Sequence, residues 1–298
     1  MHARTCVLPG GWVDATGVLH REVVFSALTG RDEAVLADPA RNRAAQITAM
    51  LTRCIQRIGT ISPVSESIVH NLLVADRDFL LLKLREATFG SRVQGTLPCP
   101  WPDCGEKVDI DFSIDDIPVT TSEDKGPVFA MSLSPEAAAF ENGKPIHELT
   151  FRLPTGADQE LVSPRLAENE SVALTELLAR CIQSIGTVAI TSPAQLEGLS
   201  SRARMEVEAE MLRVAPRIEL NMDVVCPECT RAFTAPFDLQ DFFFGEMRTS
   251  RDLLLREVHY LAYHYHWSEK EIMEMPKDAR RNYIEILADE IERLNSAG

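Results

Sequence analysis

The sequence contains one short pattern twice, and this repetition restricts the possible folds more than any other feature. Residues 53–60 (RCIQRIGT) match residues 180–187 (RCIQSIGT) at seven of eight positions, with an offset of 127. The same offset relates Cys99 to Cys226. Self-similarity over this span predicts an internally duplicated chain, in which two halves have the same fold and pack about a pseudo-twofold axis.

An amphipathic stretch leads into each copy of the repeated pattern. Its apolar residues are spaced by 3, 1, 3, 1 and 3 positions in both halves: Ile47, Met50, Leu51, Cys54, Ile55 and Ile58, and again Leu174, Leu177, Leu178, Cys181, Ile182 and Ile185. This spacing predicts a helix with one buried face, in which Cys54 and Cys181 are core residues. Gly59 and Gly186 are expected to end these helices in left-handed caps. The Ser-Pro pairs that follow predict the start of another helix.

Turn and strand signals predict the same order of elements in each half. An opening β-hairpin (residues 7–28 and 131–153) precedes two or three helices and a second hairpin that carries two cysteines. We therefore expect an α+β fold with one repeat at 7–117 and a second repeat at 131–242. The polar residues between them, 118–130, are expected to form a linker.

Residues 243–298 are expected to form a helical C-terminal tail. Apolar spacing predicts a helix over residues 252–266, and Ser268 with Glu271 predicts a capping box for a shorter helix. Pro276 ends that helix and a third helix follows. Aromatic residues in the tail are expected either to cap the domain or to face a partner.

Four cysteines occur in two short pairs at predicted hairpin turns. Cys99 and Cys104 enclose four residues, and Cys226 and Cys229 enclose two. Such turns are typical of zinc knuckles, and two knuckles supply the four ligands of a tetrahedral site. We therefore predict one structural Zn²⁺ bound by all four cysteines as a shared zinc ribbon. Duplication explains how pairs separated by 121 residues meet at one site.

Free thiols, a disulfide within either pair and a thioredoxin-like redox centre are the alternatives. An odd count of seven cysteines in a cytoplasmic setting favours thiols or metal ligands over disulfides. A redox pair is expected to open a helix, but residues 230–237 have the pattern of a strand. Four sulfur ligands leave no position for water or substrate, so we expect no catalysis there. No motif of a zinc protease, phosphate loop or nucleophile elbow indicates an enzyme or a small-molecule substrate.

The chain carries 45 acidic and 30 basic residues, which gives a net charge of −15. A field of this sign repels phosphate backbones and anionic lipids. We therefore expect neither nucleic acid nor membranes among the partners. Residues 1–11 lack the pattern of a secretory signal and no apolar run reaches membrane-spanning length, which predicts a cytoplasmic protein.

Several segments resemble the baseplate (hub) assembly chaperones and baseplate proteins of contractile-tailed bacteriophages and related contractile injection systems. They are residues 28–33 (LTGRDE), 76–81 (DRDFLL), 99–105 (CPWPDCG), 237–243 (FDLQDFF) and 263–269 (YHYHWSE), with the pair at 275–276 (MP). The resemblance implies a non-catalytic assembly or structural protein whose partners are baseplate or tail proteins. It leaves open whether the protein stays in the assembled particle. A zinc-ribbon factor associated with nucleic acid is the alternative, although such a factor needs a basic face.

Overall fold

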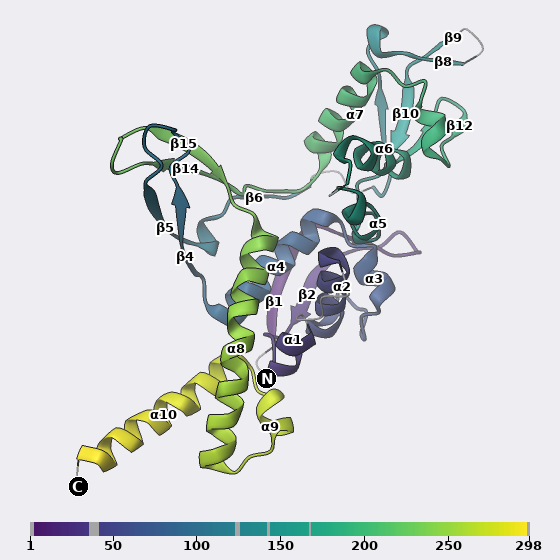
Figure 1. Ribbon diagram of the computed structural model, residues 1–298. Coiled ribbons are helices and arrows are strands. Elements are labelled where there is room, and N and C mark those ends of the chain that lie inside the picture. Colours follow the sequence, from purple (N-terminus) through teal and green to yellow (C-terminus); the bar gives the residue numbers. More distant parts are fainter. Residues whose placement is uncertain (1–2, 36–41, 123–125, 142–143, 167, 297–298) are drawn as a thin grey trace.

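The computed structural model describes residues 3–35, 42–122, 126–141, 144–166 and 168–296. Helices alternate with small antiparallel sheets along the chain (Figure 1). This arrangement confirms the predicted α+β class. Within the described residues, no helix is both long enough and apolar enough to cross a bilayer.

The N-terminal unit consists of a three-stranded antiparallel sheet, in the order β1-β2-β3, and four helices. Their bounds are β1 Arg4–Val13, β2 Leu19–Phe25, β3 Ile55–Ile58, α1 Gly30–Val35, α2 Arg43–Cys54, α3 Glu66–His70 and α4 Val74–Phe89. The Asn42 side chain accepts a hydrogen bond from the Ala45 amide and so starts α2. Helix α4 is buried on most of its surface and lies in the largest hydrophobic core of the described chain.

Strand β3 corrects one prediction. The helix expected to continue to Gly59 ends at Cys54, and residues 55–58 pair with β2 instead. Gln56 is skipped in the register with β2, and this bulge lets Ile55 and Ile58 both point into the core. The spacing of three positions that we attributed to a helix therefore arises here from a bulged strand.

The turns after the repeated pattern follow the prediction in part. Gly59 and Gly186 adopt φ values of 55° and 56°, the left-handed conformation expected of them, but each follows a strand rather than a helix. The helix start predicted at Ser62 is wrong, because α3 begins at Glu66 and its N-cap is Ser65. In the second half, the predicted Ser-Pro start does open a short 3-10 helix, η3.

The second unit contains a four-stranded antiparallel sheet in the order β12-β11-β10-β7. The bounds are β7 Phe129–Ser132, η2 Pro135–Ala137, β8 Ala139–Glu141, β9 Lys144–Ile146, β10 Glu148–Phe151, α5 Gly156–Leu166, α6 Glu170–Cys181, β11 Ile182–Ile185, β12 Val188–Ala189, η3 Pro193–Leu196 and α7 Ser201–Val214. The hairpin of β8 and β9 interrupts the opening hairpin that was predicted for this half. Gln183 is skipped in the register of β11 with β10, as Gln56 is in β3. This unit has a hydrophobic core of its own.

The same hydrogen-bonded turn occurs in both units. Asp32 accepts from the Thr29 amide at 2.9 Å and from Nε of Arg53 at 2.6 Å. The counterparts in the second unit, at the same two distances, are Asp158, Thr155 and Arg180. Each aspartate therefore ties the start of a helix, α1 or α5, to the arginine that opens the repeated RCIQ pattern.

Outside the two units, the segments on either side of the second unit form three two-stranded ribbons. They are β4 Arg92–Pro98 with β5 Lys107–Ser113, β6 Val119–Thr120 with β13 Arg217–Ile218, and β14 Asn221–Val225 with β15 Ala232–Pro236, while η1 Ile114–Asp116 follows β5. The predicted linker thus contains strand β6, which pairs with a segment almost 100 positions later. The hairpins β4–β5 and β14–β15 lie side by side at one end of this ribbon (Figure 1).

The C-terminal tail is helical as predicted, but its first helix starts earlier. The bounds are α8 Leu239–Tyr265, α9 Glu269–Met273 and α10 Lys277–Ser296. Asp238 caps α8, so the phenylalanines at 242–244 lie within the helix and pack into the main core. The capping box of Ser268 and Glu271 is present at α9.

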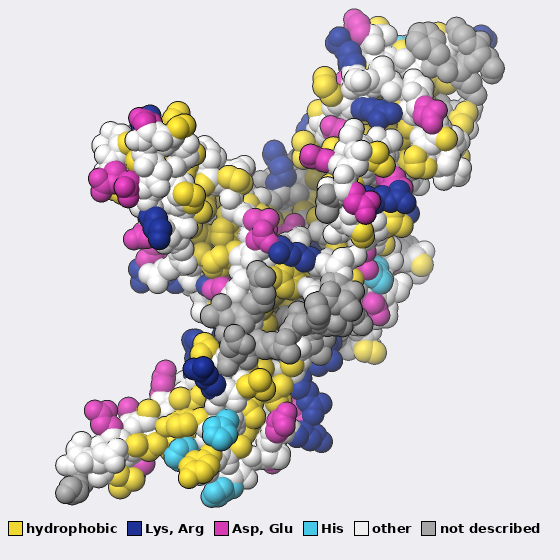
Figure 2. Space-filling model, viewed as in Figure 1, with side chains coloured by type: hydrophobic (Ala, Val, Ile, Leu, Met, Phe, Trp, Pro, Cys, Tyr) yellow, Lys and Arg dark blue, Asp and Glu magenta, His cyan; other side chains and the backbone are white. Residues whose placement is uncertain are grey.

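The aromatic residues of the tail divide into two groups. Tyr265 and Trp267 stack on each other and Tyr283 meets both rings edge to face, with ring centroids 4.6 to 5.8 Å apart. Tyr263 is exposed. Figure 2 shows hydrophobic and histidine side chains over the arm that α8, α9 and α10 form below the body. These three rings therefore join the C-terminal end of α8 and the residues that follow it to α10.

Candidate metal centre

The turn of the β4–β5 hairpin carries Cys99 and Cys104. The Cys99 amide donates to the Glu106 carbonyl at 2.8 Å, which extends the ladder into the turn. The amides of Cys104 and Gly105 both donate to the Trp101 carbonyl, at 2.9 and 3.1 Å. Gly105 has a φ of 65°, which glycine adopts at little cost. This tight turn directs two thiols out of the end of the hairpin.

The turn of the β14–β15 hairpin has similar backbone hydrogen bonds, but a threonine occupies the position that glycine holds in the first turn. The Cys226 amide donates to the Arg231 carbonyl at 3.1 Å, and the Thr230 amide donates to the Cys226 carbonyl at 2.9 Å. Thr230 follows Cys229 as Gly105 follows Cys104, and its φ is 59°. A β-branched residue seldom takes this conformation, and such strain costs about 1–3 kcal/mol.

The two turns bring the four predicted cysteines together. All four Sγ atoms lie within 4.8 Å of one another. Cys99 lies 3.8 Å from Cys229, and Cys104 lies 3.8 Å from Cys226, so the contacts cross between hairpins. Sulfurs at about 2.3 Å from one zinc in a tetrahedron are about 3.8 Å apart, whereas a disulfide bond is about 2.05 Å long. The spacing therefore fits a tetrahedral thiolate site and does not fit disulfides.

The site lies in an apolar environment. Cys226 is fully buried and Cys99 is 4% exposed, while Cys104 and Cys229 are half-buried. Val108, Val224 and Phe233 complete this small hydrophobic cluster. The Arg231 backbone N–H is the main cause that lowers the pKa of Cys229 to about 6, and the Arg231 side chain adds to this effect. This lowered pKa favours the thiolate form of Cys229, whereas the pKa values of Cys99 and Cys104 are raised in part by burial.

Arg231 also links the two hairpins around the cysteines. Its guanidinium donates to Oδ2 of Asp103 at 2.7 Å and lies 4.9 Å from the ring centroid of Trp101. The partners belong to the first knuckle, whereas Arg231 follows the second. Sequence reasoning did not identify these residues as part of the site, and their only signal was their position next to the cysteines.

The three remaining cysteines lie outside this cluster. Cys54 and Cys181 are buried in the two unit cores, as predicted. Burial raises the pKa of the Cys6 and Cys181 thiols to about 12 and also raises that of Cys54. Among the described residues, the quartet of Cys99, Cys104, Cys226 and Cys229 is the group of metal-ligating side chains that lies close enough to share one ion.

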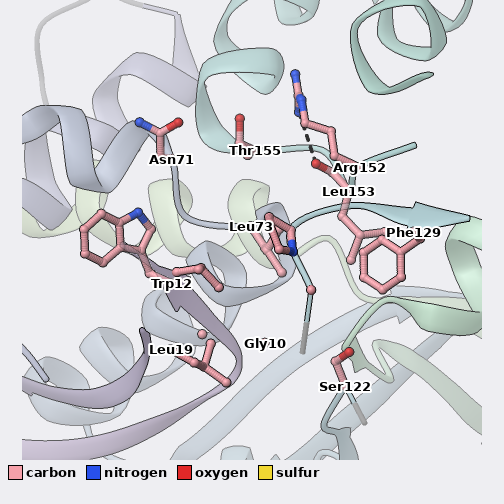
Figure 3. A pocket seen from close by; sticks show the side chains of 14 residues that line it. Gly10, Trp12, Leu19, Asn71, Leu73, Ser122, Phe129, Arg152, Leu153 and Thr155 are labelled. Carbon is pink, nitrogen blue, oxygen red and sulfur yellow. Dashed lines mark hydrogen bonds between the residues drawn. The ribbon is translucent and has the colours of Figure 1, made fainter. Parts of the chain in front are cut away.

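A separate cavity of about 350 Å³ lies between β1 and the second unit (Figure 3). Trp12 and Leu73 line one part of it, and Phe129 and Arg152 line another. Arg152 is the one charged residue among the described residues that line it, and its guanidinium donates to the Leu153 carbonyl and to Asp158. Thr155 also lines the cavity, and its hydroxyl donates at 3.0 Å to Asp158, a carboxylate that Arg152 and Arg180 already hold.

The fold and the cysteine cluster define a mixed α+β protein with a candidate thiolate metal site that joins two distant hairpins. The family model described as "T4 bacteriophage base plate protein" matches residues 12–244, which include all four cysteines. The chain belongs to this family, which confirms the resemblance found in the sequence. Neither the curated proteins nor the solved structures that were compared contain a match to this chain.

Proposed function

We propose that this protein is a non-catalytic assembly or structural component of a phage-tail-like contractile baseplate, stabilised by one Zn²⁺. Cys99, Cys104, Cys226 and Cys229 would hold this ion. The observation that carries the proposal is the cluster of four Sγ atoms within 4.8 Å, formed by hairpins from distant parts of a baseplate-family chain. We call the ion with its two hairpins the metal clamp.

The metal clamp would act in folding and not in catalysis. Four sulfurs complete the tetrahedral coordination of zinc, so no position is left for water or substrate. Binding free energy at such a site is also folding free energy, because the unfolded chain does not hold the ligands together. The clamp would join the two hairpins through ligands that lie as far apart in sequence as Cys104 and Cys226, which are separated by 122 positions. The bound ion would thus hold the two hairpins in a fixed position relative to each other.

We further propose that the chain is duplicated, with repeats at 7–117 and 131–242 about a pseudo-twofold axis. The skipped residues Gln56 and Gln183 in equivalent strands support this proposal. The turn shared by Asp32 and Asp158 supports it independently, because it repeats a set of side-chain contacts and not only a pattern of apolar residues. Under this proposal the tail, 243–298, is an addition to the duplicated body.

The proposed partners are baseplate or tail proteins, as the family name indicates. The excess of acidic over basic residues, which gives a net charge of −15, disfavours nucleic acid as the partner. A protein of this kind would act in the producing cell, either transiently or as part of the finished particle.

Elemental analysis tests the clamp. The full chain, purified without added metal, is expected to contain about one zinc per chain. Cys226→Ser is expected to lose the metal, whereas the control Cys6→Ser, at a cysteine outside the cluster, is expected to keep it. A wild-type chain without metal, in which all four thiols react freely, would overturn the proposed site.

A further inference from the structure

A groove runs between the two hairpins of the metal clamp. It has a volume of about 430 Å³ and is bordered by β5 on one side and by β14 on the other. Strands β4 and β15 do not line it, apart from Phe237 just beyond β15. The groove therefore opens along the outer edges of two neighbouring hairpins.

The outer edge of β5 offers backbone groups for pairing. Opposite residues in an antiparallel ladder alternate between exchanging hydrogen bonds and exchanging none. The bond from the Cys99 amide to the Glu106 carbonyl fixes this alternation, so every second residue from Glu106 to Phe112 turns its amide and carbonyl towards β4. Asp109 and Asp111 turn theirs to the opposite edge. Within the described chain, β5 pairs with β4 alone.

The edge of β14 is available in the same way. The Phe237 amide donates to the Leu220 carbonyl at 2.7 Å, which places Asp223 and Val225 at the positions that turn away from β15. Among the described strands, β14 pairs with β15 alone. Two strand edges therefore face one groove, and along each edge the outward amides and carbonyls pair with no other described strand. Such edges are templates for an added strand.

The groove is apolar inside and acidic at its rim. Ile110 and Phe112 of β5 and Met222 and Val224 of β14 are half-buried on the inner faces of the hairpins. The described lining contains five carboxylates and no lysine or arginine: Asp109, Asp111, Asp116, Glu219 and Asp223. Asp111 already pairs with Arg92 at 2.5 Å, so the other four carry the available charge.

We propose that this groove binds an extended segment of a partner protein, in which basic and apolar residues alternate, as a β-strand added to the edge of β5. Backbone hydrogen bonds to Asp109 and Asp111 would hold the segment in register. Because side chains alternate along a strand, every second one would enter the apolar groove and the others would lie beside the carboxylates. The acidic rim selects against acidic segments and against nucleic acid.

A labelled peptide tests this inference. The probe has alternating lysine and valine and seven residues, the length of β5. It is titrated into the full, metal-containing chain and followed by fluorescence anisotropy. We expect binding that weakens as salt increases, and no binding of the same peptide with glutamate in place of lysine. Amide hydrogen exchange is expected to slow at Asp109 and Asp111 when the lysine peptide is added.

A charge-reversal pair makes the test specific. Asp109→Lys with Asp223→Lys is expected to weaken binding roughly tenfold, because two exposed attractions become repulsions. Glu285→Lys with Asp289→Lys on α10 changes the net charge equally at exposed sites outside the groove and is expected to leave binding unchanged. Equal losses in both pairs, or protection of amides elsewhere, would overturn the inference. The inference would also be overturned if, without peptide, the groove amides were already protected from exchange by a dimer that forms at higher protein concentration.

The inference rests on the proposed function only through the metal clamp, which sets the positions of the hairpins. Zinc is therefore measured in the same sample. A chain with about one zinc that does not bind the lysine peptide would overturn the groove proposal and leave the clamp standing. A chain without zinc whose groove still binds the peptide would support the groove and overturn the clamp.

Discussion

Arg280 in α10 donates a hydrogen bond of 2.6 Å from Nη2 to Oε1 of Glu33 in α1, and both side chains are completely buried. The same guanidinium donates to Glu257 in α8 at 2.9 Å and to the Met275 carbonyl at 2.8 Å. These contacts join the last helix to the N-terminal unit across 247 positions of sequence. The tail is therefore fastened to the body by a buried ion pair as well as by apolar packing.

Removal of this guanidinium is expected to be costly. Arg280→Met leaves the Glu33 carboxylate buried without the guanidinium, and breaking a buried pair in this way costs about 3–5 kcal/mol. Arg280→Met with Glu33→Leu is expected to recover part of the loss, because it removes both charges. Urea unfolding at pH 7 measures both variants. Arg281→Met, at the exposed neighbouring residue, is the control. An equal loss of unfolding free energy in Arg280→Met and Arg281→Met would contradict this role for the buried pair.

The buried carboxylate of Asp158 is expected to make stability depend on pH. Burial on its own would raise the pKa of Asp158. Hydrogen bonds from Arg152, from the Thr155 amide and from Arg180 outweigh burial and hold this pKa well below its usual range. A lowered folded-state pKa contributes stability above the unfolded pKa, about 3.9, and this contribution is lost as the pH falls further. Asp158→Asn should therefore cost about 1.5–3 kcal/mol at pH 7 and about 1 kcal/mol less at pH 3, where the carboxyl is protonated in the unfolded chain but still ionised in the folded one.

Unfolding of wild type and Asp158→Asn in urea at several pH values measures this dependence. Asp289→Asn on the exposed face of α10 is the matched control and is expected to change stability little at any pH. A difference between wild type and Asp158→Asn that stays constant from pH 7 to pH 3 would contradict the role of the ionised carboxylate.

The sequence predicted the elements better than their boundaries. Apolar spacing identified both repeated amphipathic segments, but it could not separate α2 from β3, because the bulge at Gln56 gives Ile55 and Ile58 the spacing of a helix. The β8–β9 insertion was missed as well, since hairpins this short carry little periodicity. Local patterns report which residues are buried and do not report which backbone buries them.

The four cysteines could be identified as candidate ligands because their spacing is itself the signal. The ion pair between Arg231 and Asp103 could not, since it joins residues 128 positions apart whose types are common on any surface. Residues that orient a site through tertiary contacts remain invisible to spacing arguments.

Alanine substitutions at two glycines can distinguish the cost of backbone strain from the cost of a steric clash. Gly59 and Gly17 both have positive φ, of 55° and 83°. A Cβ at Gly59 would collide with the His20 ring, whereas a Cβ at Gly17 would meet open space. Gly17→Ala is expected to cost about 1 kcal/mol from the backbone alone, and Gly59→Ala at least about 2 kcal/mol. Thermal unfolding of the two variants measures the difference, and equal costs would show that His20 moves aside freely.

The final prediction separates the metal clamp from the interactions of the assembled particle. Cys226→Ser is expected to release the zinc and to cost several kcal/mol, because metal affinity at a structural site is folding free energy. Calorimetry with elemental analysis measures both effects. Cys6→Ser is the matched control, since this cysteine lies outside the cluster.

In the producing cell, Cys226→Ser is expected to block baseplate assembly although it removes no catalytic group, and a wild-type copy supplied in trans should restore it. Asp109→Lys with Asp223→Lys should keep the zinc and the fold, because both side chains are exposed, and should still reduce assembly if the groove receives a partner strand. The two variants would then fail for different reasons, one through folding and the other through binding. Normal particles from a strain that lacks the gene would refute the assembly role, whatever the zinc content of the purified chain.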